Sequence, residues 1–183
     1  MVVGLTGPNA AGKGEVAAML RDLGFAVHSL SDVVREEAAA RGLPPERGHL
    51  IEIGNDLRRR GGPGVLAERM VPRLRGRDVV DSIRNPSEVQ VLRGVPGFVL
   101  ARVTASMATR FRRSLARARP GDPDTLEAFR QREEQENATD PAGQQLDRTA
   151  ALADVVLDND GDLPALRRAV ERLLAECGEP RVL

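Results

Sequence analysis

Gly7-Pro8-Asn9-Ala10-Ala11-Gly12-Lys13-Gly14 is the stretch that decides the fold of this chain. It follows an apolar run, Val2 to Leu5, and it opens an amphipathic segment from Glu15 to Leu23. Strand, glycine-rich loop and helix in this order form a P-loop, or Walker A motif, in which backbone N–H groups surround phosphate and a lysine reaches the outer phosphates. The dipole of the following helix adds to this attraction. The sequence therefore predicts a nucleoside triphosphate site formed by Gly7, Asn9, Ala10, Ala11, Gly12, Lys13, Gly14 and Glu15.

The loop departs from the usual pattern directly after Lys13. A serine or threonine hydroxyl is expected there as a magnesium ligand, but the chain has Gly14 followed by Glu15. Without that hydroxyl, Mg²⁺ would depend more on carboxylates and on ATP itself.

Composition limits the classes of protein to consider. A length of 183 residues fits a single domain, here expected to span residues 1–183. The 27 basic and 27 acidic residues balance, and only four Phe with no Trp or Tyr are present, so nucleic acid is not an expected partner. No apolar run is long enough for a membrane span, no leader is recognisable, and one cysteine excludes an internal disulfide. We therefore expect a cytoplasmic protein without a membrane partner.

Apolar runs alternate with amphipathic stretches along the chain, which is typical of a parallel sheet covered by helices. Strands are expected near Val2–Leu5, Ala26–Leu30, Asp78–Asp81, Phe98–Val103 and Val155–Leu157. Helices are expected over Lys13–Leu23, Ser31–Arg41, Glu46–Arg60, Gly64–Leu74, Pro86–Arg93, Ser106–Arg117, Thr125–Asn137 and Leu163–Cys177, with a further helical stretch around Gln144–Leu152.

Two segments rich in glycine or proline interrupt this pattern. Gly61–Gly64 separates two helices, and Arg119–Pro123 breaks a charged helical pair. Both could be ordinary loops. In a phosphotransferase they would belong to a helical acceptor-binding flap at about 31–75 and to a lid at about 113–137, because a closing lid excludes water from phosphoryl transfer.

Two carboxylates are each followed, three residues later, by an arginine. Asp32 and Arg35 come after the second expected strand, and Asp81 and Arg84 close the third. Taken singly, Asp32 could cap its helix and Arg35 could belong to a surface salt bridge. The carboxyl ends of parallel strands are where ligands bind, and phosphoryl transfer needs metal-binding carboxylates and phosphate-binding cations. The repeated pattern beside a P-loop therefore favours a catalytic site.

A third basic cluster and a late turn extend the candidate site. The cluster comprises Arg110, Arg112, Arg113, Arg117 and Arg119. It could be a solvated helix side, but it leads into the expected lid, so one or two members are expected to reach nucleotide phosphates or to stack on the base. Asn159 to Gly161 could meet the adenine edge or form an ordinary turn. Glu133, Glu134 and Glu136 are expected to form a solvated face.

The order and spacing of these motifs resemble the P-loop nucleoside monophosphate kinases, and adenylate kinase in particular, over nearly the whole chain. The stretch Ala153–Gly161 and the opening Gly4–Gly7 are also similar to dephospho-coenzyme A kinase. The segments 81–88 and 119–123 look most like a prokaryotic group of predicted nucleotide kinases. The resemblance implies a three-layer α/β fold: a five-stranded parallel sheet in the order 2-3-1-4-5, helices on both faces, and a small lid.

The resemblance also implies a donor site that uses ATP and Mg²⁺. Lys13 and the amides of Gly7–Gly14 would hold the ATP phosphates. Arg113 would stack on the base beside Asn159, and Arg117 would act at the transferring phosphate.

The acceptor side is implied by the same resemblance. Asp32 and Asp81 would orient Mg²⁺, through its waters, and Arg35 and Arg84 would grip the acceptor phosphate. Lys13, Asp32, Arg84 and Arg117 are thus the residues expected to be catalytic.

Three functions stay open at this point. The first is a kinase, monomer or homodimer, that phosphorylates a nucleoside or deoxynucleoside monophosphate. The second is dephospho-coenzyme A kinase, for which Asp32 could serve as the base toward a ribose hydroxyl. The third is a nucleotide-binding regulator without catalysis, suggested by Glu15 beside the phosphates. Adenylate kinase has a threonine after its Gly-Lys-Gly, and dephospho-coenzyme A kinase has a serine after the lysine. This chain departs from both, because it has Gly14 and Glu15 at these positions. Thr104 is a further departure, since these kinases often carry an acidic residue there.

Overall fold

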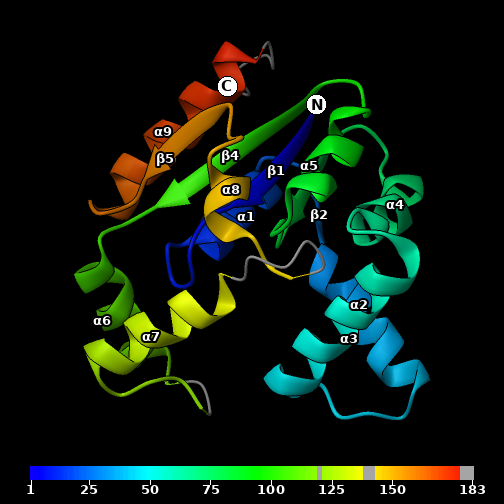
Figure 1. Ribbon diagram of the computed structural model, residues 1–183. Coiled ribbons are helices and arrows are strands. Elements are labelled where there is room, and N and C mark those ends of the chain that lie inside the picture. Colours follow the sequence, from blue (N-terminus) through cyan, green and yellow to red (C-terminus); the bar gives the residue numbers. More distant parts are fainter. Residues whose placement is uncertain (119–120, 138–142, 178–183) are drawn as a thin grey trace.

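A parallel β-sheet forms the centre of the protein, described here from a computed structural model that covers residues 1–118, 121–137 and 143–177. Its strands are β1 (Val2–Thr6), β2 (Ala26–Ser29), β3 (Asp78–Asp81), β4 (Phe98–Thr104) and β5 (Val155–Asp158). They lie in the order β2-β3-β1-β4-β5 (Figure 1). Val2 of β1 pairs with Asp78 of β3 and with Phe98 of β4, so β1 is enclosed on both sides. The predicted number, direction and order of the strands are confirmed.

Helices connect these strands, because parallel neighbours need crossover connections. They are α1 (Lys13–Asp22), α2 (Leu30–Ala40), α3 (Arg47–Gly61), α4 (Val65–Met70), α5 (Pro86–Arg93), α6 (Met107–Arg117), α7 (Leu126–Glu136), α8 (Leu146–Ala150) and α9 (Leu163–Glu176). The helix predicted over Gly64–Leu74 is shorter than expected. It ends at Met70 and continues as a 3₁₀ turn, Val71–Arg73. Pro72 accounts for this break, because proline has no N–H to continue the helical hydrogen bonds.

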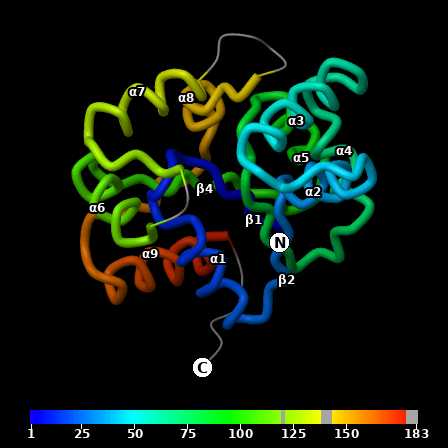
Figure 2. The backbone as a smooth tube through the Cα atoms, turned by 90° about the horizontal axis from the view of Figure 1, so that it is seen from below, coloured from blue at the N-terminus to red at the C-terminus, as the bar shows by residue number. Residues whose placement is uncertain are grey.

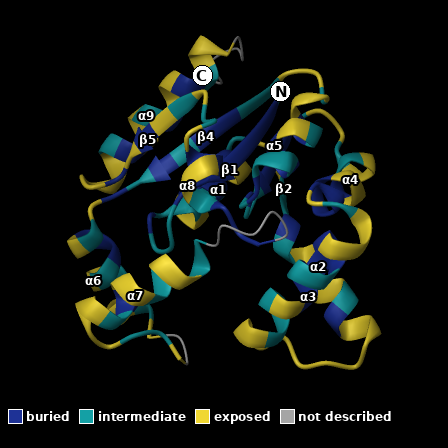
Figure 3. Ribbon diagram, viewed as in Figure 1, coloured by how far each residue is buried: buried dark blue, intermediate teal, exposed yellow. Residues whose placement is uncertain are grey.

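The two faces of the sheet carry separate hydrophobic cores. Successive residues of a strand point to opposite faces, so Val2 packs with α2–α5 while Val3 packs with α1 and α9. Both valines are fully buried, and β1 lies buried at the centre of the molecule (Figure 3). This packing fixes the position of the P-loop, which begins where β1 ends.

Two pairs of helices project past the carboxyl ends of the strands. The pair α2 and α3 lies on one side and the pair α6 and α7 on the other, with α8 between them (Figures 1 and 2). These pairs overlap the segments predicted as flap (about 31–75) and lid (about 113–137). Arg119, which was predicted as part of the basic cluster, lies outside the described residues. Among the described helices, none is both long enough and apolar enough to cross a membrane.

Candidate functional site

The P-loop between β1 and α1 is a tight turn that demands glycine at two positions. Gly7 and Gly12 have φ angles of 130° and 102°, and Ala10 has a φ of 59°. A Cβ at Gly7 would lie 2.1 Å from the carbonyl oxygen of Val103, and one at Gly12 would lie 2.0 Å from Nδ2 of Asn159. A side chain at either glycine would therefore displace β4 or the turn after β5.

The Lys13 ammonium is folded onto the loop itself. Its Nζ donates hydrogen bonds to the carbonyl oxygens of Gly7 (2.8 Å) and Pro8 (2.9 Å). Burial lowers the pKa of Lys13 from 10.5 to about 8, because the charged form is desolvated. A phosphate group beside the amine would favour its protonated form and so offset the effect of burial on the pKa.

Four further charged side chains lie close enough to Lys13 to affect its pKa. Asp81 at the end of β3 and Glu133 on α7 raise that pKa, whereas Arg84 after β3 and Arg110 on α6 lower it. These side chains come from separate elements that meet at the carboxyl edge of the sheet. Cations and carboxylates at one point are what phosphoryl transfer requires.

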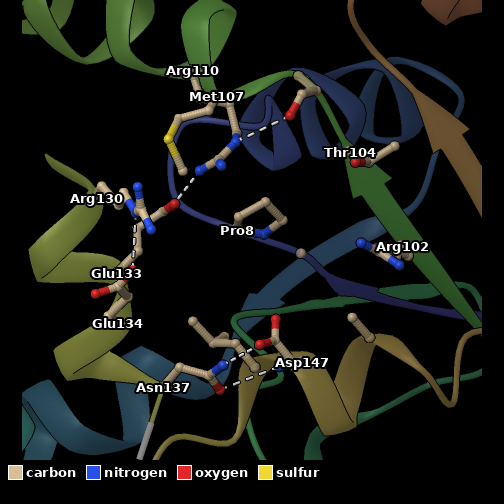
Figure 4. Close-up of a pocket in the computed structure, with 14 residues that line it drawn as sticks. Pro8, Arg102, Thr104, Met107, Arg110, Arg130, Glu133, Glu134, Asn137 and Asp147 are labelled. Atoms are coloured by element: carbon tan, nitrogen blue, oxygen red, sulfur yellow. Dashed lines mark hydrogen bonds and ion pairs between the residues drawn. The ribbon is translucent and has the colours of Figure 1, made fainter. Parts of the chain in front are cut away.

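Arg110 was predicted only as one member of the basic cluster, and Glu133 as part of a solvated face. The Arg110 guanidinium donates to the carbonyl oxygens of Ala105 (3.1 Å) and Asn9 (3.4 Å), and it forms an ion pair with Glu133 (Figure 4). Arg110 thereby connects the P-loop with the lid helix α7.

The expectation of a solvated glutamate face on α7 is wrong for two of the three glutamates. The side chains of Glu133 and Glu136 are 20% and 13% exposed, against 63% for Glu134. Glu133 and Glu136 follow Phe129 at helical spacing, four and seven residues on, and Phe129 is the buried residue of α7. That spacing is the signal in the sequence that could have identified them.

Asp81 is the last residue of β3, and Arg84 lies on the short loop between β3 and α5. The Asp81 carboxylate accepts a hydrogen bond from the N–H of Ser82 at 2.6 Å. The Arg84 side chain donates to the Gln144 side chain at 3.1 Å, and its N–H donates to the Glu88 carboxylate at 2.8 Å. Burial lowers the pKa of the Arg84 guanidinium. The structure thus brings this predicted pair close to Lys13.

Asp32 and Arg35 are placed differently. They form an ion pair with each other at 2.7 Å within α2, and each side chain is 52% exposed. Among the described residues, neither has a hydrogen bond or ion pair to the P-loop or to Asp81. Their roles toward magnesium and the acceptor remain predictions.

Arg113 and Asn159 meet at the P-loop, and their contact with a nucleotide base remains a prediction. The Arg113 guanidinium donates to the Asn159 carbonyl oxygen at 2.8 Å, and the Asn159 amide donates to the Ala11 carbonyl oxygen at 2.8 Å. Arg117 instead lies within the lid, where it forms an ion pair with Asp122 at 2.9 Å. Its contact with a transferring phosphate remains a prediction.

Two cavities flank the charged cluster. The lid cavity, of about 370 Å³, lies between the P-loop, β4 and helices α6, α7 and α8 (Figure 4). The flap cavity, of about 330 Å³, lies between α3, α7 and the segment Gly143–Gln144. Both have the size of small-molecule sites.

The residues near Lys13 fit a magnesium ion that arrives with ATP. Within the described part of the chain, no group of three or more His, Cys, Asp or Glu residues could hold a metal by itself. Mg²⁺ commonly takes one or two carboxylates together with phosphate oxygens and water, and Asp81 is a carboxylate in that position. A Cβ added at Gly14 would meet no atom within 4 Å, so crowding does not account for the missing hydroxyl.

Comparison with known proteins identifies relatives over nearly the whole length of the chain. It is 35% identical to a UPF0200 protein of Hyperthermus butylicus over 179 residues, which cover 96% of this chain and 94% of the relative. It is 34% identical to a UPF0200 protein of Methanoculleus marisnigri over 182 residues, with 97% of each chain covered. No family model matches the chain.

Solved structures share the same fold. TT1252 from Thermus thermophilus superposes with a TM-score of 0.60 at 25% identity and covers 96% of this chain and 97% of its own. The shikimate kinase of Bacteroides thetaiotaomicron superposes with a TM-score of 0.62 at 16% identity, with the same coverage. The predicted P-loop kinase fold is therefore confirmed.

Proposed function

The chain belongs to the UPF0200 family, and from the charges around Lys13 we propose that it is an ATP- and Mg²⁺-dependent phosphotransferase acting on a nucleoside or deoxynucleoside monophosphate. One observation carries the proposal. The Lys13 ammonium, two guanidinium groups (Arg84 and Arg110) and the Asp81 carboxylate converge at the end of β1. Cations from several elements at one point would stabilise the charge that spreads over a transferring phosphoryl group.

The donor half of the site would be formed by the P-loop. Its amides and Lys13 would hold the ATP phosphates, and the Lys13 amine would exchange the Gly7 and Pro8 carbonyls for phosphate oxygens. Arg110 would contact the same phosphates once Glu133 releases it. Asp81 would hold the magnesium ion through water, and the bound ion would neutralise charge on the phosphates.

The acceptor half would be formed around Arg84. Its side chain donates to Gln144, which lines the flap cavity, so the Arg84 guanidinium would lie directly behind the wall of a cavity that held a monophosphate. A phosphate oxygen of the acceptor would attack the γ-phosphorus of ATP as the bond to the β-phosphate oxygen breaks, which yields ADP and a nucleoside diphosphate. Arg84 would hold the two phosphates in line against their mutual repulsion. This arrangement favours an anionic acceptor over a bare hydroxyl.

The test is a panel of acceptors with ATP and Mg²⁺, in which both ADP and the phosphorylated product are measured. We expect turnover with one or more nucleoside monophosphates. Turnover with dephospho-coenzyme A alone would overturn the proposed acceptor, and tight ATP binding without product from any acceptor would indicate a regulator.

Lys13→Ala should lower the rate with the best acceptor by at least about 10²-fold, because it removes a cation from the transition state. Arg21→Ala is the matched control, since Arg21 is an exposed cation at the far end of the same helix. An unchanged rate in the Lys13 variant would contradict the P-loop assignment.

A further inference from the structure

The wall of the lid cavity contains one charged side chain with no hydrogen-bond or ion-pair partner among the described residues. Arg102 of β4 lines the cavity on the side opposite α7 (Figure 4). It forms no hydrogen bond or ion pair with any described residue, and its Nε is buried without a partner. The side chain itself is half-buried.

The other charges of the cavity wall are already paired. Arg110 pairs with Glu133, and Arg130 pairs with Glu134 at 3.0 Å. The Asp147 carboxylate accepts a hydrogen bond from the Asn137 side chain. Among the described lining residues, Arg102 is the cation without a partner.

An arginine is unexpected at this position of the sheet. β4 lies between β1 and β5, and its neighbouring residues Ala101 and Val103 are fully buried on the opposite face. Strands covered on both faces are usually apolar throughout. The buried Nε of this guanidinium has lost water without gaining a partner, which costs free energy that an anion beside it would offset.

We propose that the lid cavity binds an organic oxyanion, a carboxylate or a phosphate ester, whose charged group contacts Arg102. Thr104, two residues further along the same strand, also lines the cavity and adds a hydroxyl to it. Met107, Leu146 and Ala150 supply apolar surface for the body of the molecule. The site differs from the P-loop amides, and it stands whether or not the protein transfers phosphate.

Phenyl phosphate and benzoate are suitable probes, with neutral benzamide for comparison. Their binding to the full chain would be measured by ligand-observed NMR with ADP at saturation, so that the P-loop is filled. We expect both anions to bind and benzamide to bind much more weakly. Displacement of the anions by ADP, or equal binding of benzamide, would overturn the proposal.

Arg102→Met should weaken phenyl phosphate binding by about tenfold or more, because a charge-assisted hydrogen bond is lost. Arg130→Met is the matched control: it removes a cation from the same cavity that is already paired and 61% exposed, and it should change binding by less than about threefold. Equal affinities of the Arg102 variant and the unmodified chain would contradict an oxyanion site at Arg102.

Two measurements separate binding from folding. Thermal unfolding of the Arg102 variant should begin at a similar temperature, because the half-buried guanidinium has no partner among the described residues to lose. Ala150→Met keeps Arg102 and fills the cavity from α8, so it should also abolish phenyl phosphate binding; unchanged binding would place the probe elsewhere. Lys13→Ala should leave this binding unchanged, which distinguishes failure of this site from failure of the phosphotransferase.

The oxyanion could belong to the phosphate acceptor or to a separate small molecule. Competition with a monophosphate that is turned over distinguishes the two sources. Displacement of phenyl phosphate would make the lid cavity part of the acceptor site, and simultaneous binding would make it an independent site.

Discussion

At the scale of single residues, the position of Lys13 changes the reactivity of its amine. It is the only lysine in the chain, and burial lowers its pKa to about 8. In the ligand-free protein, a large share of this amine is therefore neutral and nucleophilic at pH 8, whereas an exposed lysine is almost fully protonated. Bound phosphate would restore the charged form.

Lys13 should consequently be acylated by an amine-specific reagent with a rate that rises around pH 8, well below the pH at which exposed lysines react. ADP or ATP should slow this reaction, because phosphate raises the pKa of the amine and covers it. Mass spectrometry of peptides after acetylation at several pH values would measure both effects. The α-amino group of Met1, at the opposite end of β1, serves as the unprotected control. A rate that rises only near pH 10.5 would contradict the burial of Lys13.

At the scale of elements, Glu88 joins the flap to the loop that carries Arg84. One carboxylate oxygen accepts from the Arg58 guanidinium of α3 at 2.7 and 3.1 Å. The other accepts from the N–H groups of Arg84 (2.8 Å) and Asn85 (3.1 Å) as part of the capping box of α5. The side chains of Glu88 and Arg58 are 0% and 5% exposed. This carboxylate therefore fixes where Arg84 lies relative to α3.

Glu88→Gln should lower the free energy of unfolding by about 3–5 kcal/mol, because the buried Arg58 charge loses its counter-charge. Urea denaturation would measure the change. Glu134→Gln is the control, since that side chain is 63% exposed and should change stability by less than about 0.5 kcal/mol. If both variants unfolded at the same urea concentration, the Arg58–Glu88 pair would not hold the loop as inferred.

At the scale of the whole molecule, the flap and the lid are joined by an ion pair in the wall of the flap cavity. Arg47 at the start of α3 forms an ion pair with Glu136 at the end of α7. The same lid helix is tied to the P-loop through Glu133 and Arg110. The lid thus contacts both halves of the site, and ATP phosphates would compete with Glu133 for Arg110.

Glu136→Gln should loosen the lid, because it removes the contact between α7 and α3. A partly exposed ion pair contributes about 0.2–1 kcal/mol, so backbone amides of α7 should exchange with deuterium up to about fivefold faster. Amides of α1 should keep their rates, and Glu134→Gln, whose partner Arg130 lies on the same helix, should not alter exchange in α3. Unchanged exchange across α7 would show that the pair does not hold flap and lid together.

Local features of the sequence were sufficient for most of the fold. Glycine spacing and the strand before it predicted the P-loop, and alternating apolar and amphipathic runs predicted the five strands and the helices. The position after β3 placed Asp81 and Arg84 at the carboxyl edge, because every strand of a parallel sheet ends there. The Gly64–Leu74 helix was predicted too long, since Pro72 ends it.

The sequence by itself therefore determined the fold class, the P-loop and the position of Asp81 and Arg84 after β3, because these depend on patterns and spacing within short segments. Only the tertiary structure decided which charges face one another. Arg110 and Glu133 lie on different helices. The spacing from Phe129 indicates that Glu133 is half-buried, but it does not say that this face of α7 turns toward the P-loop. Arg102 could not be identified from the sequence for the same reason. The sequence does not show whether an arginine on a strand faces a carboxylate or a cavity. Ion pairing depends on the packing of whole helices, and that packing is settled by burial of apolar side chains such as Phe129 of α7, whose ring packs against Phe111 of α6.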